Sequence, residues 1–116
     1  MSFDYRLKKE KDFNLVFRNG KRAYSDSLSA VFIPSEDIKA DTVKAGFAVG
    51  KKHGGSVERN RIKRLLRESF RSFVPEISKN FCFVFIPKVK EEYTLDKFKK
   101  DMGYILKKNG FIIKKC

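Results

Sequence analysis

Apolar residues recur along this chain with two different periods, and the change of period separates helices from strands. Spacings of three and four residues predict helices, whereas alternating or continuous apolar residues predict strands. The predicted helices cover residues 10–19, 56–73 and 94–110, and the predicted strands cover residues 21–34, 43–49 and 80–86. The stretch 21–34 is long enough to form either one strand or a bent pair of strands.

The order of these elements, α-β-β-β-α-β-α, predicts an α+β fold: a single-domain α/β sandwich with a four-stranded mixed sheet. Residues 43–49 and 80–86 flank a helix, so this βαβ crossover should place the two strands parallel. Most such crossovers are right-handed, and the periodicity alone leaves the hand open. We assign residues 1–116 to one domain, with residues 1–9 as a flexible arm and residues 111–116 as a tail of unknown role.

The helix predicted over residues 56–73 has an apolar face and a basic face. At about 100° per residue, its apolar side chains fall together, while Arg and Lys recur every four positions elsewhere. Ser56 is a candidate N-cap, with Glu58 in the first turn. The apolar face comprises Ile62, Leu65, Leu66, Ser69, Phe70 and Phe73, and the basic face comprises Arg59, Lys63, Arg67 and Arg71, with Asn60 and Arg64 beside them.

The charge of this region is unusual for a solvated helix. Residues 51–73 carry eight Lys and Arg and two Glu, a net charge of +6. A solvated face usually mixes Glu and Lys four residues apart, whereas like charges at that spacing repel one another. A bound polyanion relieves such repulsion. The formal net charge of the whole chain is +13, which favours the same kind of partner, a nucleic acid or an anionic membrane surface.

Other features of the sequence narrow the partner and the compartment. No apolar run approaches the roughly 20 residues of a membrane span, and we expect no membrane partner. The first residues include acids and lack an apolar signal core. Cys82 and Cys116 are interpreted as free thiols, which are typical of a reducing cytoplasm. Together these features predict a cytoplasmic protein.

The chain is poor in catalytic groups. A protein nuclease generally uses clustered carboxylates to hold metal ions, or paired histidines for acid–base chemistry. Here the 14 acidic residues are scattered, and His53 is the only histidine. We interpret His53 as a loop residue rather than a metal ligand or a base. We therefore expect no catalytic residue, and no metal or other cofactor bound by the protein in its own right.

The first predicted helix places Phe13 and Phe17 on one face. These rings can fill the core or, beside a basic surface, can stack on the bases of a single-stranded nucleic acid. One face of the predicted strand 43–49 is nearly bare, because it carries Gly46 and Ala48. Small residues there allow close approach by a ligand or by this helix, and both interpretations stay open.

Two segments resemble the sequence signatures of one family. Residues 58–67, Glu-Arg-Asn-Arg-Ile-Lys-Arg-Leu-Leu-Arg, with the preceding Gly50-Lys51-Lys52, resemble the Arg-Asn-Arg helix of the bacterial ribonuclease P protein subunit. Residues 13–20, Phe-Asn-Leu-Val-Phe-Arg-Asn-Gly, resemble that family's Phe-x-x-Val-Phe-x-x-Gly signature. The chain departs from the family pattern at Gly54 and Gly55, where members often carry basic or amide residues, which weakens the case for an RNA contact by this loop.

The resemblance implies a subunit of ribonuclease P, the endonuclease that removes the 5′ leader from precursor transfer RNA. In that family the RNA subunit is the catalyst, and magnesium ions held through the RNA do the chemistry. The implied partners are the catalytic RNA and precursor transfer RNA, and not DNA. A left-handed crossover is implied as well. The residues implied to bind the catalytic RNA are Lys51, Lys52, Arg59, Asn60, Arg61, Lys63, Arg64 and Arg67, and those implied to bind the leader are Phe13, Phe17 and Lys51.

Two other classes of protein stay open from the residues alone. A non-enzymatic nucleic-acid-binding module, such as a ribosomal protein, would share the basic helix and the sandwich, but would not explain both signatures. A protein-only nuclease would cleave precursor transfer RNA with magnesium in the absence of any RNA subunit.

Overall fold

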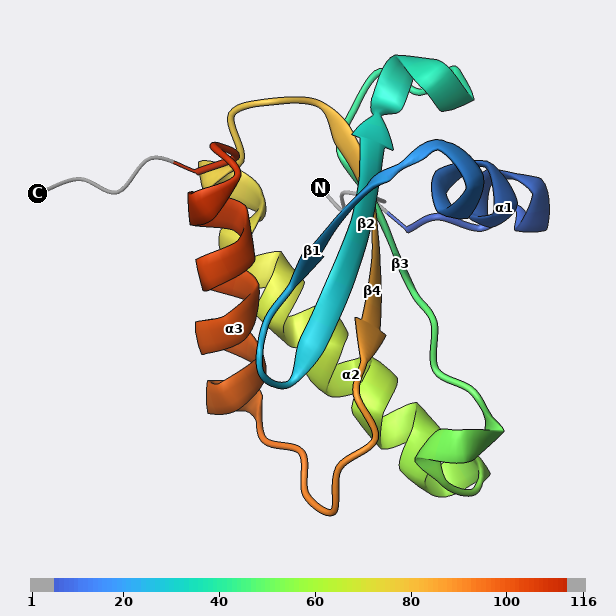
Figure 1. The fold of residues 1–116 in the computed structure, drawn as a ribbon, viewed down its shortest axis with the longest axis vertical. Coiled ribbons are helices and arrows are strands. Elements are labelled where there is room, and N and C mark those ends of the chain that lie inside the picture. Colours follow the sequence, from blue (N-terminus) through green and yellow to red (C-terminus); the bar gives the residue numbers. More distant parts are fainter. Residues whose placement is uncertain (1–5, 113–116) are drawn as a thin grey trace, which may run out of the picture.

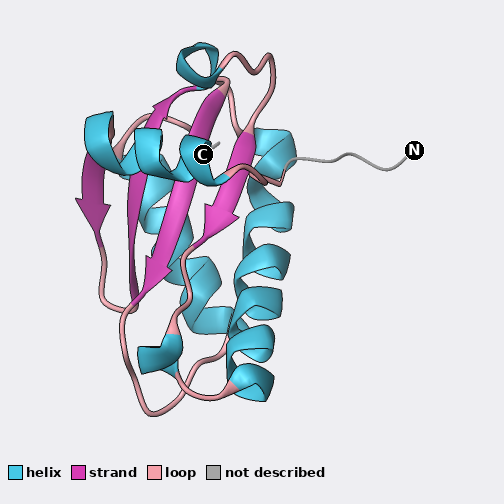
Figure 2. Ribbon diagram, turned by 90° about the vertical axis from the view of Figure 1, so that its right-hand side faces the viewer, coloured by secondary structure: helices cyan, strands magenta, loops and turns pink. Residues whose placement is uncertain are grey.

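The computed structural model describes residues 6–112, and helices lie on both sides of one sheet (Figure 1). Helices α2 and α3 lie side by side on one face, and the shorter α1 crosses the other face (Figures 1 and 2). The predicted element order is confirmed, with residues 21–34 forming a bent pair of strands. The helices are α1 Glu10–Asn19, α2 Ser56–Phe73 and α3 Leu95–Lys108; the strands are β1 Lys21–Tyr24, β2 Leu28–Pro34, β3 Lys44–Phe47 and β4 Phe81–Pro87; and short 3-10 turns occur at Ser35–Ile38, Lys51–His53 and Val74–Glu76.

The strand order in the sheet is β1-β2-β4-β3. β1 and β2 form an antiparallel hairpin, β2 also pairs antiparallel with β4, and β3 pairs parallel with β4. In Figure 1 the sheet lies in front of α2, and the chain passes from β3 on the right to β4 on its left, with β4 pointing downward. The β3-α2-β4 crossover is therefore left-handed, as the resemblance implied.

The face covered by α2 and α3 carries an aromatic core. Phe83 and Phe85 on β4 are fully buried, and their ring centroids lie 5.9 and 5.6 Å from that of Phe70 on α2. Ile62 and Leu66 of α2 are also fully buried in this cluster. Burying one such side chain contributes about 1.5–3 kcal/mol relative to leaving it exposed. β4 is central and covered on both faces, which explains its continuous apolar sequence.

The residues that follow α3 belong to this core. Gly110 has a φ of 79°, which glycine adopts readily, and it turns the chain back after the helix. Phe111 and Ile112 are then buried, so this part of the predicted tail of unknown role packs into the core. The remainder of the expected tail lies outside the described residues. The ring centroid of Phe111 lies 5.0, 4.8 and 4.9 Å from those of Phe32, Phe81 and Phe83.

The expected N-terminal arm also differs from the structure where it is described. Leu7 is buried, and its backbone N–H donates to the carbonyl oxygen of Ala45 at 2.8 Å. This contact adds a short parallel bridge to the outer edge of β3. The expectation of a flexible arm is therefore wrong for Leu7, because one apolar residue among charged neighbours finds a site against the sheet.

The face covered by α1 has a smaller core. Val16 of α1 is fully buried against a cluster that includes Val31, Cys82 and Val84. Burial, with a smaller contribution from the negative charge of Asp12, raises the pKa of the Cys82 thiol to about 12. Cys82 is accordingly an inert, protonated thiol at neutral pH, in agreement with its interpretation as a free cysteine.

Gly20 ends α1, as predicted, but space rather than conformation selects glycine there. Its φ of −77° is open to any residue. A Cβ at this position would lie 2.5 Å from the carbonyl oxygen of Val16 and 2.6 Å from Cγ1 of Val31. The close packing of the α1 C-terminus on β2 therefore requires a residue without a side chain.

Candidate nucleic-acid interface

Helix α2 turns its predicted apolar face to the sheet. Ile62, Leu66, Ser69 and Phe70 are buried, and the flanking apolar residues are partly buried. Val57, which does not fit the apolar stripe, is 83% exposed. The division of this helix into an apolar and a basic side is therefore confirmed, and the cations are mounted on a helix whose position the core fixes.

The basic residues of α2 occupy the remainder of its surface. Asn60 and Arg64 are exposed, whereas Arg59, Lys63 and Arg67 are half-buried along one flank. The Nε atoms of Arg59 and Arg67 are buried and have no hydrogen-bond partner among residues 6–112. Because these two nitrogens are buried, a phosphate oxygen would bind the other N–H groups of the two guanidinium groups, which are good partners for phosphate.

Arg61 is placed differently from the other basic residues of its motif. Its Nη2 donates to the carbonyl oxygen of Tyr93 at 3.0 Å, and its Nη1 lies 3.5 Å from a carboxylate oxygen of Glu58. Two positions along a helix correspond to a rotation of about 200°, which separates Arg61 from the flank of Arg59. Part of the Arg61 guanidinium therefore fastens α2 to the segment between β4 and α3.

The N-cap of α2 lies one residue earlier than predicted. Gly55 takes the N-cap position, and no side chain accepts a hydrogen bond there, so the prediction of Ser56 as N-cap is wrong. Glu58 lies in the first turn, where the helix dipole favours negative charge. Gly54 has a φ of 122°, and a Cβ there would lie 3.1 Å from the Glu58 side chain, so both strain and space favour glycine.

Lys51 and Lys52 are exposed on the 3-10 turn that follows β3. His53 ends this turn and is 5% exposed. Its Nε2 lies 2.7 Å from the carbonyl oxygen of Pro87, and the backbone N–H of Gly50 donates to its Nδ1 at 3.0 Å. The tautomer that carries its proton on Nε2 satisfies both contacts. His53 is thus a structural residue that ties the turn to the end of β4, rather than a simple loop residue.

Phe13 and Phe17 are half-buried between α1 and the sheet. Phe13 packs directly on Gly46, because a Cβ on Gly46 would fall within the van der Waals radius of the Phe13 ring. Close packing of α1 on the small-residue strand is therefore confirmed at this position. Approach by a ligand stays an interpretation for the part of the face that α1 leaves uncovered.

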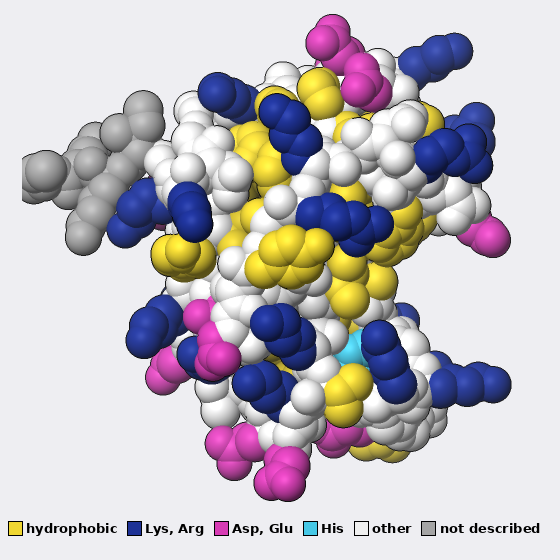
Figure 3. All heavy atoms as spheres, in the orientation of Figure 1, with side chains coloured by type: hydrophobic (Ala, Val, Ile, Leu, Met, Phe, Trp, Pro, Cys, Tyr) yellow, Lys and Arg dark blue, Asp and Glu magenta, His cyan; other side chains and the backbone are white. Residues whose placement is uncertain are grey.

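Helix α1 covers only the end of the sheet where β4 begins (Figures 1 and 2). Toward the other end, half-buried Ser29, Ala48 and Ile86 form what we call the open face. Figure 3 shows apolar side chains in a hollow below α1, with Lys and Arg around it. β3 leads from this end of the sheet to Lys51 and the start of α2 (Figure 1). The open face therefore lies between the predicted leader residues of α1, at one end of the sheet, and the turn that leads into α2, at the other end.

Arg22 borders the same region and was missed by sequence reasoning. Its Nη2 donates to the carbonyl oxygen of Phe17 at 3.5 Å, across the junction between α1 and β1. Ala23 packs toward the α2 side, so alternation along β1 places Arg22 and Tyr24 on the α1 side. That alternation was the available signal, but β1 is too short for a clear pattern.

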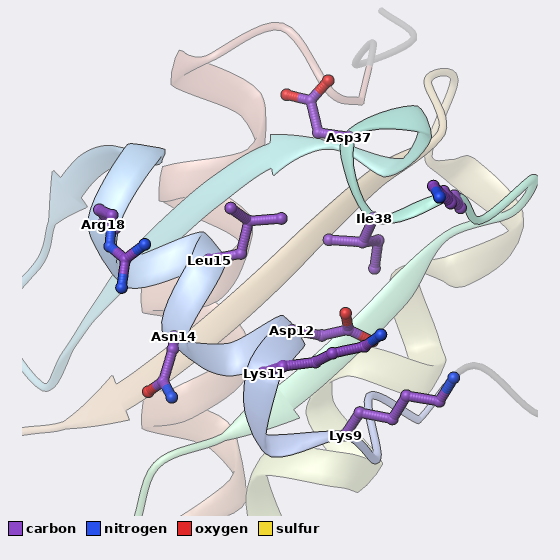
Figure 4. Close-up of a pocket in the computed structure, with 9 residues that line it drawn as sticks. Lys9, Lys11, Asp12, Asn14, Leu15, Arg18, Asp37 and Ile38 are labelled. Carbon is purple, nitrogen blue, oxygen red and sulfur yellow. The ribbon is translucent and has the colours of Figure 1, made fainter.

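A separate pocket of about 530 Å³ lies on another flank of α1, beside the 3-10 turn Ser35–Ile38 (Figure 4). Its lining mixes cations such as Lys11 and Arg18 with the carboxylates of Asp12 and Asp37. Figure 4 shows these side chains spread around the pocket rather than converging on one point. None of the predicted site residues lines it, and its mixed charge does not define an anion site.

Two further findings bear on the class of protein. Over residues 6–112, no group of three or more His, Cys, Asp or Glu side chains is arranged to hold a metal ion. None of the helices in that range is long and apolar enough to cross a membrane. The fold and the surface define a small, basic α+β protein with a cationic helix on one face of the sheet and a partly uncovered opposite face.

Comparison with known proteins identifies the family. A family model described as Ribonuclease P matches residues 1–110. The chain is 33% identical over 111 residues to the ribonuclease P protein component of Clostridium novyi. This match covers 95% of this chain and 97% of that protein. It is also 39% identical over 92 residues to the ribonuclease P protein component of Finegoldia magna. This match covers 79% of this chain and 78% of that protein. The chain belongs to the ribonuclease P protein component family.

Solved structures agree with this assignment. The ribonuclease P protein of Staphylococcus aureus has a TM-score of 0.82 at 24% identity, covering 96% of this chain and 100% of that one. The ribonuclease P protein of Thermotoga maritima has a TM-score of 0.77 at 30% identity, and the match covers 89% of this chain and 96% of that one. The fold predicted from the sequence is therefore confirmed.

Proposed function

We propose that this chain is the protein subunit of a ribonuclease P ribonucleoprotein and that it assists removal of the 5′ leader from precursor transfer RNA. Family membership supports the role in ribonuclease P. The observation that carries the proposal is α2, whose apolar side is buried on the sheet and whose other side is nearly single-signed. Cations held so close together repel one another, and a phosphate backbone relieves that repulsion.

The basic side of α2 and the turn before it would dock on the catalytic RNA. Arg59, Lys63 and Arg67 support this assignment most directly, because they lie together along one flank of α2. Arg61 contributes less, because Tyr93 already accepts one of its hydrogen bonds. The full set proposed for the catalytic RNA is Lys51, Lys52, Arg59, Asn60, Arg61, Lys63, Arg64 and Arg67.

The α1 side of the sheet would hold the single-stranded leader. Phe13 and Phe17 are half-buried rather than sealed in the core, and the open face lies beside them. Base stacking on aromatic rings tolerates any sequence, which suits a leader that differs between transfer RNAs. Lys51 lies at the end of the strand that borders this face and would bind leader phosphates.

The chemistry would belong to the RNA subunit, with magnesium held through the RNA, so that the protein acts as an accessory subunit. The state of the only histidine supports this division, because two backbone groups occupy both ring nitrogens of His53. No DNA or membrane partner is part of the proposal.

Reconstitution with a bacterial ribonuclease P RNA at low magnesium tests this function. The protein should raise the cleavage rate of precursor transfer RNA by the RNA subunit, and purified protein alone should leave the precursor intact. Magnesium-dependent cleavage by RNA-free protein that survives nuclease-free controls would identify a protein-only nuclease instead. No change in the RNA subunit's activity at any protein concentration would refute the accessory role.

A further inference from the structure

A second aromatic and basic surface lies at the opposite edge of the sheet. A hollow of about 280 Å³ opens between β1 and α3, and the rings of Tyr24 and Tyr104 border it. These two side chains are 64% and 51% exposed. Among the described residues that line it, the charged ones are the cations Arg22 and Lys108. We call these four residues the tyrosine edge.

Exposed rings beside cations have the chemistry that binds unpaired nucleotides. The ammonium group of Lys108 lies 3.2 Å from the Tyr104 hydroxyl and 5.4 Å from its ring centroid, so the charge and the ring are held together. A tyrosine ring has few rotatable bonds and a large face, so it binds a base with little loss of conformational entropy. Arg22 supplies a second cation on the Tyr24 side.

The two elements that carry these rings are fastened to each other. The backbone N–H of Ser27, in the β1–β2 turn, donates to a buried carboxylate oxygen of Asp101 on α3 at 2.9 Å. Beside it, Lys97 of α3 lies 2.8 Å from a carboxylate oxygen of Asp26. The hairpin and α3 are thus positioned before any ligand binds, which reduces the entropy lost on binding.

The tyrosine edge also continues the open face. Tyr24 pairs with Ser29 across β1 and β2, and Ser29 pairs with Ile86 across β2 and β4. Directly paired residues point to the same side of a sheet, so these three residues form one row across the uncovered half. Arg22, through its hydrogen bond to the Phe17 carbonyl, joins this row to the end of α1.

We propose that the tyrosine edge binds unpaired RNA nucleotides that run beyond the open face, with bases stacked on Tyr24 and Tyr104 and phosphates beside Arg22 and Lys108. The surface view in Figure 3 shows yellow side chains with Lys and Arg beside them over β1 and α3. Naming the distal part of the precursor leader as the source of these nucleotides rests on the proposed function. A protein strand added to edge strand β1 is the competing occupant, and the positive sign of the described charged residues in the lining favours RNA.

The test combines leader length with paired tyrosine variants. Holoenzymes carrying Tyr24→Ala with Tyr104→Ala would bind precursors whose leaders contain either a few or about 15 nucleotides, the upper range of a single-stranded site on one small domain. The affinity for the long leader should fall about tenfold or more, and that for the short leader should hardly change. Tyr24→Phe with Tyr104→Phe should keep the affinity, because the rings remain. Val89→Ala, at a 58% exposed apolar residue elsewhere, is the control.

A second measurement separates this inference from the proposed function. Full-length protein without RNA would be titrated with a fluorescein-labelled single-stranded RNA and followed by anisotropy. Weaker binding by the Ala pair, restored by the Phe pair, supports the tyrosine edge even if the catalytic RNA is not a partner. Unchanged binding in both assays, or an equal loss for both leader lengths, overturns it. A change in self-association by sedimentation, with RNA binding unaltered, would assign the surface to protein contacts instead.

Discussion

The two faces of the sheet are built from the same four strands, yet only one of them is closed. On the α2 and α3 side, Phe83 and Phe85 are fully buried under two long helices and Phe111. On the α1 side, Gly46 lies under a single helix of 10 residues, and Ala48 belongs to the part of the face that this helix leaves uncovered. Alternate residues of each strand point to opposite faces of the sheet. The size of the side chains on each face therefore determines which face can receive a partner.

This difference separates stability from binding. A domain of this size buries a limited share of its surface, so a dense aromatic core on one face supplies much of the stability. The other face can then keep Phe13 and Phe17 half-buried without endangering the fold. Helix α2 takes part in both roles, because its apolar side closes the core while its basic side faces outward.

The largest expected effect belongs to the closed face. Phe70→Ala should lower the free energy of unfolding by about 3–5 kcal/mol, because it removes a fully buried ring that contacts Phe83 and Phe85. Urea unfolding followed by circular dichroism measures this loss. Val57→Ala, at an exposed position of the same helix, should stay within about 0.5 kcal/mol of the parent. Similar values for both variants would contradict a closed core.

The next largest effect separates the two sides of α2. Ile62→Ala should lower stability by about 2–5 kcal/mol, the usual result of truncating a buried aliphatic side chain. The pair Arg59→Ala with Arg64→Ala should instead leave stability nearly unchanged and weaken binding to the catalytic RNA. The slope of log affinity against log salt should become shallower by roughly 0.7–0.9 for each phosphate that the variant no longer neutralises. Filter binding over a salt series measures both the affinity and this slope.

A charge-matched control makes this contrast specific. Lys99→Ala with Lys100→Ala removes two exposed cations from α3, where the sequence indicates a solvated face. The affinity of this double variant for the catalytic RNA should stay close to that of the parent protein. Equal losses for the two pairs would show that net charge, rather than α2, governs docking.

Arg61→Ala should also reduce stability, by about 1 kcal/mol, because it removes the hydrogen bond to Tyr93.

Much of this architecture could be predicted from periodicity, because long amphipathic segments have few alternatives. α2 and β4 each carry a strong pattern, and their positions follow from it. Tertiary contacts between distant parts of the chain were beyond such reasoning. Phe111 finds its partners across the core, and His53 bonds to Pro87. The residues adjacent to Phe111 and His53 in the sequence do not indicate which distant residues they contact.

The candidate site divides in the same way. A single motif pointed to the basic residues of α2, but their sequence spacing could not show that Arg61 faces Tyr93. Arg22 and Tyr24 lie on a strand of four residues, too short for alternation to be recognised before its pairing with β2 is known. Short elements acquire their orientation from neighbours, and the residues that they carry are the ones that sequence reasoning misses.

A smaller effect is expected where α1 meets the sheet. Gly46→Ala should lower stability by about 1–3 kcal/mol, because the added methyl group overlaps the Phe13 ring and forces α1 to shift. Gly50→Ala is the matched control, since a Cβ there meets nothing within 4 Å. Thermal unfolding of the two variants makes the comparison. If Gly46→Ala is as stable as Gly50→Ala, α1 moves freely on the sheet and does not define a fixed cleft.

The smallest effect on stability, and the sharpest test of the open face, is expected for Phe17→Ala. Phe17 is half-buried, so its removal should reduce stability much less than the about 3–5 kcal/mol of a core phenylalanine. The free energy of binding to precursor transfer RNA should become less favourable by about 1–3 kcal/mol, which is the contribution of a stacked base. Affinity for mature transfer RNA, which has no leader, should hardly change. Binding curves for both RNAs with parent and variant holoenzymes, beside a denaturant melt, give the three values. An equal loss for the two RNAs, or a large loss of stability with leader discrimination intact, would place Phe17 in the core and leave the open face without its proposed aromatic contact.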